Sequence, residues 1–311
     1  MPPKVSINLC CYNSEKFLQE TLRSIEEQTF TDWELVVIND GSSDSTESII
    51  MEFKSRGFPV IYHYQENRGL GYSRNRAIEL SSGEYLAFID HDDMWLPEKT
   101  VKQVDVVKSC QDVDLVYSNL FVTKKGRQTI FHKKRQSSGY VFDKFLRYYP
   151  VSISTVMIRK RSLDRLGGFF DSNLILTEEF DLFMRVLYGS KAAYIDQPLA
   201  VYRIHPGMSS IKYIEKFPDE MAYTIGKFKE MDPSFEVKYS SELDYLNAKI
   251  GYYRARAEML HNNTQKARAC LYPFRLTDYR FFLLYVITFF SPKVWHKMHS
   301  FMTKGAFSEP D

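Results

Sequence analysis

The densest group of chemistry-bearing residues is an acidic tetrapeptide, Asp90-His91-Asp92-Asp93. Three carboxylates within four residues repel one another, and this repulsion costs stability unless a cation or hydrogen-bond donors offset it. An extended segment would project Asp90 and Asp92 to the same side. Mg²⁺ and similar hard cations bind oxygen ligands and bridge carboxylates to substrate phosphates. The tetrapeptide therefore predicts a divalent-metal site; the alternative is an acidic loop that caps a helix beginning near Pro97.

Two further polar clusters follow short apolar runs. Cys11-Tyr12-Asn13 follows residues 5–9, and Asn39-Asp40-Gly41-Ser42 follows residues 34–38, just as the acidic tetrapeptide follows residues 85–89. Ligands of open α/β sheets bind beyond the carboxyl ends of the strands. Any one cluster is compatible with a simple turn, but three in this position predict one shared site.

Arg74 lies in a glycine-rich segment, residues 67–75. Gly69 and Gly71 imitate the start of a dinucleotide-binding fingerprint, but Arg74 stands where the third glycine belongs, and the segment does not follow the first strand. These departures argue against a nicotinamide-dependent oxidoreductase. The segment is better interpreted as a turn that presents Arg74 to a phosphate or a base; the alternative is a solvated arginine on a helix.

Carboxylates also begin a later helix, expected from about Glu179 to Leu187. The helix dipole favours acidic side chains such as Glu178 at this end, so the pattern alone is structural. Beside a metal site, however, such a carboxylate can take the proton of an attacking hydroxyl. His205 is a candidate metal or phosphate ligand, although a lone histidine is more often structural.

The elements that must position these residues alternate between strand-like and helix-like segments up to about residue 120. This alternation predicts parallel βαβ units in an open sheet. A further strand is expected over residues 151–158, and the chain becomes mostly helical after about residue 215. We therefore expect an α/β catalytic domain over 1–215 and a helical C-terminal region over 216–311.

The overall charge of +2 excludes the strongly basic surface typical of nucleic-acid binders. The longest apolar run, residues 281–290, is about half of the ~20 residues that span a bilayer. No signal peptide is recognised, so a cytoplasmic protein is expected. Residues 279–286, continuing to Lys293, Trp295, His296 and Lys297, are apolar and aromatic with a basic end. Such a segment suits peripheral contact with the inner face of the cytoplasmic membrane; the alternatives are packing on the catalytic domain or a homo-oligomer contact.

Taken in order, these motifs resemble the family-two glycosyltransferases with the GT-A fold, over residues 4–212. Single motifs are loose, but the ordered set is specific. The residues that carry the resemblance are Val5-Ser6-Ile7, Tyr12-Asn13, Gln28-Thr29-Phe30, Trp33-Glu34-Leu35, Asn39-Asp40-Gly41-Ser42 with Asp44, Asn67-Arg68-Gly69, Arg74-Asn75, Asp90-His91-Asp92-Asp93 with Trp95 and Pro97, Gly167-Gly168-Phe169, Glu178-Glu179 with Asp181-Leu182 and Arg185, and Tyr202-Arg203 with His205.

The resemblance implies a mostly parallel open sheet flanked by helices, with a helical C-terminal extension. It implies a nucleotide-sugar donor, most often a UDP-sugar, with Tyr12 and Asp40 at the base and Arg74 near the base or diphosphate. The full set of implied donor-binding residues is Tyr12, Asn13, Asp40, Arg74, Asp90, His91 and Asp92. Mn²⁺ or Mg²⁺ would be held by ligands drawn from Asp92, Asp93 and His205.

The catalytic base would come from Glu178 and Glu179, where the family usually has Glu-Asp, and Glu179 takes the usual Asp position. The implied reaction is an inverting transfer to a hydroxyl of a glycan or a lipid-linked oligosaccharide in bacterial polysaccharide biosynthesis. The alternative is a nucleotide-sugar-binding partner protein without catalytic activity. Glu179 in place of Asp favours that alternative, whereas the intact aspartates argue against it.

Overall fold

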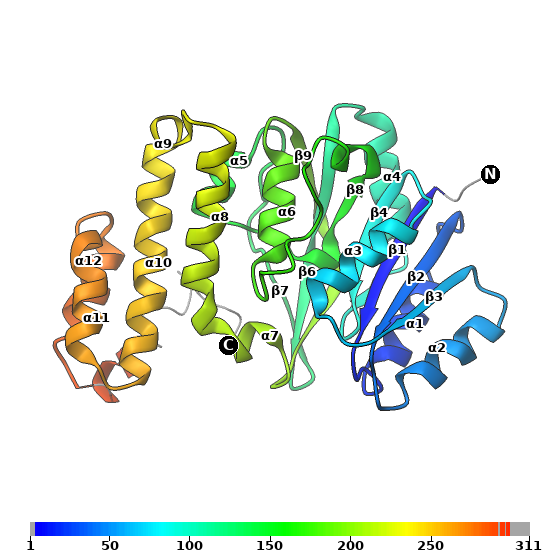
Figure 1. Ribbon diagram of the computed structural model, residues 1–311, viewed down its shortest axis with the longest axis horizontal. Helices are drawn as coiled ribbons and strands as arrows, with labels where there is room; N and C mark the ends of the chain where they lie inside the picture. Colours follow the sequence, from blue (N-terminus) through cyan, green and yellow to red (C-terminus); the bar gives the residue numbers. More distant parts are fainter. Residues whose placement is uncertain (1–3, 292, 296, 299–311) are drawn as a thin grey trace. The chain divides into compact units, whose positions relative to one another are not determined.

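The computed structural model describes residues 4–291, 293–295, 297 and 298 of the 311-residue chain (Figure 1). The chain divides into two compact units. The first unit contains the residues up to Phe142 together with Pro150–Met208. The second unit contains Asp143–Tyr149 and the residues from Ser209 onward.

The N-terminal part of the first unit alternates between strands and helices, as predicted. The strands are the apolar runs, and β2 is buried at every position because helices cover both faces of the sheet. In chain order the elements are β1 (Val5–Cys11), α1 (Leu18–Glu26), β2 (Trp33–Asp40), α2 (Thr46–Ser55), β3 (Val60–Gln65), α3 (Leu70–Leu80), β4 (Tyr85–Asp90), β5 (Met94–Trp95) and α4 (Lys99–Ser109).

The rest of the first unit completes the sheet. Its elements are β6 (Val113–Lys124), β7 (Arg127–Ile130), the first residue of α5 (Phe142–Arg147), the 3₁₀ turns η1 (Ile153–Thr155) and η2 (Lys160–Leu163), β8 (Met157–Arg159), α6 (Glu178–Leu187) and β9 (Lys191–Ile204). Within the described residues the strands form one nine-stranded sheet in the order β3-β2-β1-β4-β8-β6-β9-β5, with β7 paired to β6.

The direction of strand pairing changes along the sheet. β3, β2, β1 and β4 are parallel neighbours, and the long pairing of β6 with β9 is also parallel. β8 lies antiparallel between β4 and β6. β5 pairs with β9 and β7 pairs with β6, and both short pairings are antiparallel. The predicted fold class is confirmed, and its mostly parallel sheet is mixed where the short strands enter.

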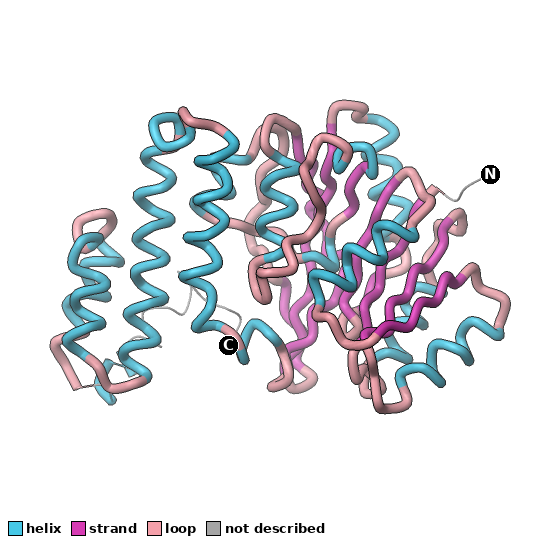
Figure 2. The backbone as a smooth tube through the Cα atoms, in the orientation of Figure 1, coloured by secondary structure: helices cyan, strands magenta, loops and turns pink. Residues whose placement is uncertain are grey.

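Helices cover the two faces of this sheet (Figures 1 and 2). Leu22 of α1 and Ile50 of α2 share one buried apolar cluster with Ile7 of β1, and α4 belongs to the same cluster. On the opposite face Ala77 of α3 packs with Val36 of β2. The alternation of side chains along each strand therefore places two apolar layers around the sheet and leaves its carboxyl edge for polar residues.

The strand predicted over residues 151–158 is mostly wrong, because only its last two residues belong to a strand, β8. Residues 153–155 form η1, a 3₁₀ turn. Local polar contacts explain the difference: the Ile153 N–H donates to Glu179, and the Ser154 hydroxyl donates to Asp93. These bonds turn the backbone toward the acidic residues, so the alternating sequence pattern does not become a strand.

The second unit is helical, as predicted for this part of the chain. Its elements are the remainder of α5, then α7 (Ser209–Lys212), η3 (Ile214–Lys216), α8 (Phe217–Met231), α9 (Phe235–Lys238), α10 (Ser240–Leu260), α11 (Thr264–Leu271), η4 (Tyr272–Phe274) and α12 (Tyr279–Ile287). α10, α11 and α12 share a core that includes Tyr252, Leu271 and Phe281. Among the described residues, no helix combines the length and the apolar content needed to cross a bilayer.

Residues 143–149 belong to this helical unit through Arg147. Its guanidinium lies 3.8 Å from the Glu242 carboxylate of α10 and over the Tyr245 ring. Lys249 of α10 lies 3.5 Å from the Arg147 carbonyl oxygen, and burial lowers the pKa of its ammonium to about 8. The short segment is thus held by side chains far along the sequence.

Candidate active site

The polar clusters meet at one edge of the sheet because of strand register. At the end of β1, Cys11 is paired with Asn39 of β2, and Cys10 is paired with Asp90 of β4. Three neighbouring parallel strands therefore end side by side. The residues that follow them, which the sequence predicts to share a site, begin at the same edge.

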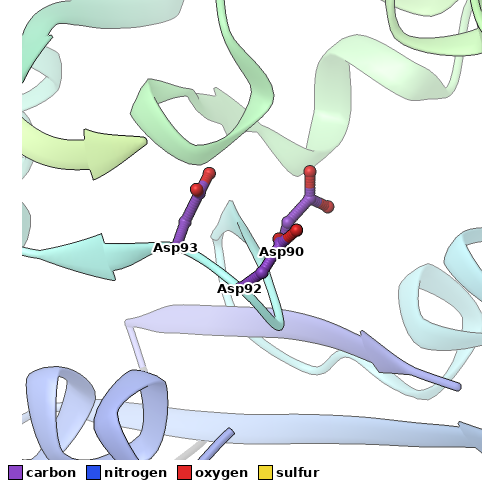
Figure 3. A group of neighbouring side chains, drawn as sticks. All are labelled: Asp90, Asp92 and Asp93. Carbon is purple, nitrogen blue, oxygen red and sulfur yellow. The ribbon is translucent and has the colours of Figure 1, made fainter. Parts of the chain in front are cut away.

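The acidic tetrapeptide forms a tight turn after β4, in which the Asp93 N–H donates to the Asp90 carbonyl oxygen at 3.1 Å. Asp90, Asp92 and Asp93 lie side by side on this turn (Figure 3), and one carboxylate oxygen from each lies within 4.8 Å of the others. The turn therefore gathers three oxygen ligands of the kind that hard divalent cations prefer.

Asp93 is the buried member of the group, with 1% of its surface exposed. Its carboxylate accepts from the Ser154 hydroxyl at 2.6 Å and from the Arg203 N–H at 3.2 Å. Burial, followed by the nearby charges of Asp92 and Asp90, raises the pKa of this carboxyl well above its usual range. Asp93 is thus engaged by the protein on both oxygens, whereas Asp92 is partly exposed.

His205 joins this group from the end of β9, as its candidate role requires. Its Nε2 lies 2.7 Å from Asp92 Oδ2, and its ring lies 4.9 Å from the ring of Phe17. The Gly207 N–H donates to Nδ1 at 3.2 Å, so a neutral ring carries its proton on Nε2 and donates it to Asp92. A cation bound by Asp92 would meet this same imidazole edge.

Arg74 is buried between two carboxylates rather than turned toward solvent. One terminal nitrogen binds Glu178 at 2.5 Å and the other binds Asp90 at 2.8 Å, while the guanidinium lies 5.4 Å from the centre of the Phe170 ring. The two negative charges raise the pKa of Arg74 against the effect of its burial. Arg74 therefore links the end of β4 to the start of α6.

Glu178 and Glu179 differ sharply in their surroundings. Glu178 is 4% exposed and is engaged by Arg74. Glu179 accepts a hydrogen bond from the Ile153 N–H at 3.0 Å. Burial is the main cause that raises the pKa of Glu179 to about 8, with the Arg74 charge opposing it and the charges of Glu178 and Asp90 adding to it. Of the pair, Glu179 has the carboxyl that is free of an ion pair with Arg74.

Asp40 is held by the segment that follows β3. Its Oδ1 accepts from the Arg68 N–H and from the Gln65 side chain, and its Oδ2 accepts from the Gly69 N–H at 2.9 Å. The adjacent Gly41 has φ +77°, and a Cβ there would lie 2.8 Å from the Asn67 backbone nitrogen. This close approach constrains the loop around the Asp40 carboxylate. Within the described part of the chain, Oδ2 of Asp40 accepts one hydrogen bond, from Gly69.

The other predicted donor-binding residues lie on the loops after β1 and β4. Asn13 adopts φ +48°, and its side-chain oxygen accepts from the Ser43 N–H at 2.9 Å, so it ties the first loop to the second. The Tyr12 side chain is half exposed. His91 has a buried Nδ1 without a hydrogen-bond partner among the described residues. Tyr12 therefore offers an open ring, and Asn13 shapes the loop beside it.

Comparison with known protein families identifies the class of protein to which this site belongs. The family model described as "Glycosyl transferase family 2" matches residues 6–167, which is more than half of the chain. The chain belongs to glycosyl transferase family 2. This assignment confirms the resemblance and makes the protein a glycosyltransferase. The matched region contains β1 from its second residue onward, together with β2, β4 and the acidic tetrapeptide.

Two curated relatives illustrate where this glycosyltransferase stands in its family. An uncharacterized glycosyltransferase of Rickettsia typhi is 28% identical over 74% of this chain and 73% of its own length. TuaG of Bacillus subtilis, described as a putative teichuronic acid biosynthesis glycosyltransferase, is 26% identical over 68% of this chain and 83% of its own length.

Solved structures similar to this glycosyltransferase share its fold. S. aureus TarS in complex with UDP-GlcNAc aligns over 96% of this chain and 92% of that chain, with 20% identity and a TM-score of 0.71. The mannosyltransferase PcManGT from Pyrobaculum calidifontis, in complex with GDP-Man and Mn²⁺, aligns over 97% and 85%, with 17% identity and a TM-score of 0.62. These similarities support the GT-A fold class.

Ser154 is a site residue of this glycosyltransferase that the sequence does not single out. Its hydroxyl donates to Asp93 and accepts from the Asp90 N–H at 3.2 Å, and its carbonyl oxygen accepts from the Trp95 indole at 2.7 Å. A serine in an apolar, strand-like stretch gives no motif signal. Only the approach of η1 to the acidic turn reveals it.

Proposed function

We propose that this glycosyltransferase moves a sugar from a UDP-sugar to an acceptor hydroxyl, with inversion at the anomeric carbon and with the aid of Mn²⁺ or Mg²⁺. The main support for the proposal is that one short turn, η1, positions both the acidic turn and Glu179. Ser154 holds the acidic turn, and the neighbouring Ile153 N–H holds Glu179. A cation-binding group and a candidate base are therefore positioned together.

The donor would bind along the loops after β1, β2 and β4. The nucleotide base would contact the half-exposed ring of Tyr12 and the carboxylate of Asp40, whose Oδ2 accepts a hydrogen bond from the Gly69 N–H. Asp90 and His91, with Asn13 shaping the loop, would lie along the ribose and diphosphate. Arg74 would support Asp90 through its ion pair, because both ends of its guanidinium are engaged by carboxylates. The UDP-GlcNAc complex of TarS supports a nucleotide-sugar donor of this kind.

The acidic turn fits a hard divalent cation, because three carboxylates offer oxygens within 4.8 Å of one another. Asp92 is the ligand that the geometry favours, since Asp93 is already hydrogen-bonded on both oxygens. His205 would join it through Nε2 once the ring proton moves to Nδ1 and replaces the Gly207 N–H contact. A bound cation would neutralise charge on the departing diphosphate. The Mn²⁺ in the PcManGT complex supports this cofactor class.

Glu179 is the proposed base. Its ionised carboxylate would take the hydrogen of the acceptor hydroxyl as that oxygen bonds to the anomeric carbon. The bond from the anomeric carbon to the diphosphate oxygen would break on the opposite face, so one displacement inverts the centre and releases UDP. Glu178 would serve to hold Arg74. An acceptor on a glycan or a lipid-linked oligosaccharide in polysaccharide biosynthesis is supported by the description of TuaG.

The test is UDP release from UDP-sugars supplied one at a time, with Mn²⁺ or Mg²⁺ and then with a chelator. Water can replace an unknown acceptor slowly, so release from one donor identifies the sugar. We expect chelator-sensitive release that Asp92→Ala and Glu179→Ala abolish. Asp105→Ala, which changes an exposed carboxylate on α4, is the matched control and should retain release.

Two other outcomes distinguish an active transferase from a nucleotide-sugar-binding partner protein or contradict the proposed site. Tight UDP binding without release from any donor, with or without candidate glycan acceptors, favours the nucleotide-sugar-binding partner protein. Absence of metal-dependent UDP binding contradicts the proposed donor site itself. Calorimetry with UDP and Mn²⁺ measures this binding directly, without any acceptor.

A further inference from the structure

The helix α12 is apolar on the face turned away from its own core. Phe281, Leu284 and Ile287 are buried against the neighbouring helices. The opposite face is formed by Tyr279 and the side chains three, four and seven residues after it, which is the spacing of one helical stripe. These side chains, all at least partly exposed, are Tyr279, Phe282, Leu283 and Val286, and exposed Phe290 follows shortly after the helix ends at Ile287.

The exposure of this stripe is substantial. Tyr279 is 73% exposed, and the exposed fractions of Phe282, Leu283 and Phe290 are 47%, 43% and 47%. Leu276, immediately before the helix, is 80% exposed and extends the stripe. Isolated exposed apolar residues are ordinary, whereas a contiguous apolar surface marks an interaction site. We call Leu276, Tyr279, Phe282, Leu283 and Phe290 the α12 apolar face.

Basic residues outnumber acidic ones in the stretch of sequence that carries this face. In residues 259–298, the acidic residue Asp278 stands against six basic residues: Lys266, Arg268, Arg275, Arg280, Lys293 and Lys297. Asp278 is itself ion-paired with Arg280 at 2.9 Å, so it does not offset the remaining cations. Lys293 and Lys297 are exposed, while the predicted neighbour His296 lies outside the described residues. This excess of basic residues favours a partner of the α12 apolar face that carries negative charge.

We propose that the α12 apolar face binds an anionic phospholipid surface peripherally. Aromatic and aliphatic side chains beside lysine and arginine match both the interfacial and the headgroup layers of such a surface. A two-fold contact between copies of this chain would bring like charges together, because the same patch meets itself. α12 has nine residues, which is far too few to span a bilayer.

The α12 apolar face belongs to the helical unit, and the proposed donor site belongs to the unit that contains the sheet. This proposal therefore does not rest on the proposed sugar transfer. The test is co-sedimentation of the full chain with vesicles of phosphatidylglycerol and phosphatidylcholine in equal amounts, compared with phosphatidylcholine alone. We expect binding to the anionic vesicles that weakens when NaCl is raised from about 0.1 M to about 0.5 M.

Phe282→Glu combined with Leu283→Glu should lower vesicle partitioning by about tenfold or more, because it removes apolar contact and adds negative charge. Val237→Glu is the matched control, since Val237 of α9 is 85% exposed and lies outside the α12 apolar face. Lys293→Glu with Lys297→Glu provides a second variant that leaves the core of α12 intact. Circular dichroism verifies that each variant folds.

Failure of the wild-type chain to bind anionic vesicles would overturn the proposal, as would equal binding by the wild type and both multiple variants. Light scattering tests whether a second copy of the chain covers the α12 apolar face instead. A dimer that Phe282→Glu with Leu283→Glu dissociates, without any vesicle binding, would show that the face joins two copies of the chain and would also overturn the proposal.

Discussion

Glu179 is both the proposed base and a half-buried carboxyl, and the second property limits the first. Its ordinary pKa is 4.5, and burial raises it to about 8. The protonated carboxyl cannot take a proton from the acceptor, so the fraction of Glu179 that can act as a base falls as the pH drops below that value. The Glu for Asp replacement thus keeps the chemistry available, but at a pH set by the surroundings of the side chain.

The pH profile of sugar transfer tests this role. We expect kcat to rise as the pH increases through about 8 and to level off only above about pH 9, since only the ionised carboxylate acts as a base. Glu179→Gln should remove both the activity and this rise while leaving UDP affinity unchanged. A wild-type profile that is flat across this range would exclude Glu179 as the base.

Arg74 should be a determinant of stability as well as of the site. Arg74→Met would leave Glu178 buried without its ion-pair partner, and we expect a loss of about 3 kcal/mol in the free energy of unfolding. Urea denaturation measures the loss. The double variant Arg74→Met with Glu178→Gln should recover part of it, because it removes the uncompensated charge; equal stabilities of the single and double variants would contradict this coupling.

At the scale of elements, the short turn η1 connects the acidic turn to α6. Its residues contact the acidic turn through Ser154 and the start of α6 through the Ile153 N–H. Groups that orient metal ligands are nearly as important for affinity as the ligands themselves. A displacement of η1 would therefore change the proposed cation site and the proposed base together.

Ser154→Ala tests this connection. Loss of the hydroxyl removes its bonds to the Asp93 carboxylate and to the Asp90 N–H, which loosens the acidic turn that carries Asp92, so we expect Mn²⁺ affinity to fall by about tenfold. Binding of Mn²⁺, followed by electron paramagnetic resonance in the presence of UDP, provides a measurement independent of turnover. Ser154→Thr keeps the hydroxyl and should restore affinity; if Ala and Thr variants bind Mn²⁺ equally well, the hydroxyl does not position the carboxylate.

The sequence predicts the elements that carry strong periodic signals. The apolar runs before Asp40 and Asp90 end in polar residues, and parallel pairing then brings those ends to one edge. This logic correctly predicts the open sheet and the grouping of the acidic residues. The geometry also places His205 beside Asp92, as its candidate role requires.

Other features depend on contacts between distant residues and leave no local pattern. Residues 151–158 look like a strand, yet hydrogen bonds to Glu179 and Asp93 turn them into η1. The sequence also cannot show that Arg74 lies between Asp90 and Glu178, since these partners are 16 and 104 residues away. Local propensity fails where tertiary hydrogen bonds decide the backbone.

At the scale of the whole molecule, donor and cation should stabilise the fold together. The proposed site for UDP and Mn²⁺ exists only in the folded chain, so we expect the melting temperature to rise by several degrees at saturating ligand. Asp92→Asn should remove the part of the shift that depends on Mn²⁺ and leave any effect of UDP alone. Differential scanning fluorimetry measures both; an Asp92→Asn chain with the full Mn²⁺-dependent shift would rule out Asp92 as a ligand.

The path of the chain between the two units has a consequence for protein engineering. Residues 143–149 belong to the helical unit, although the chain returns afterwards to the sheet. A gene fusion that exchanges everything after Met208 would separate Arg147 from its native partners, Glu242 and Tyr245. Shuffling of C-terminal regions among relatives therefore requires a matched pair of segments, and a single crossover point would yield a mismatched hybrid.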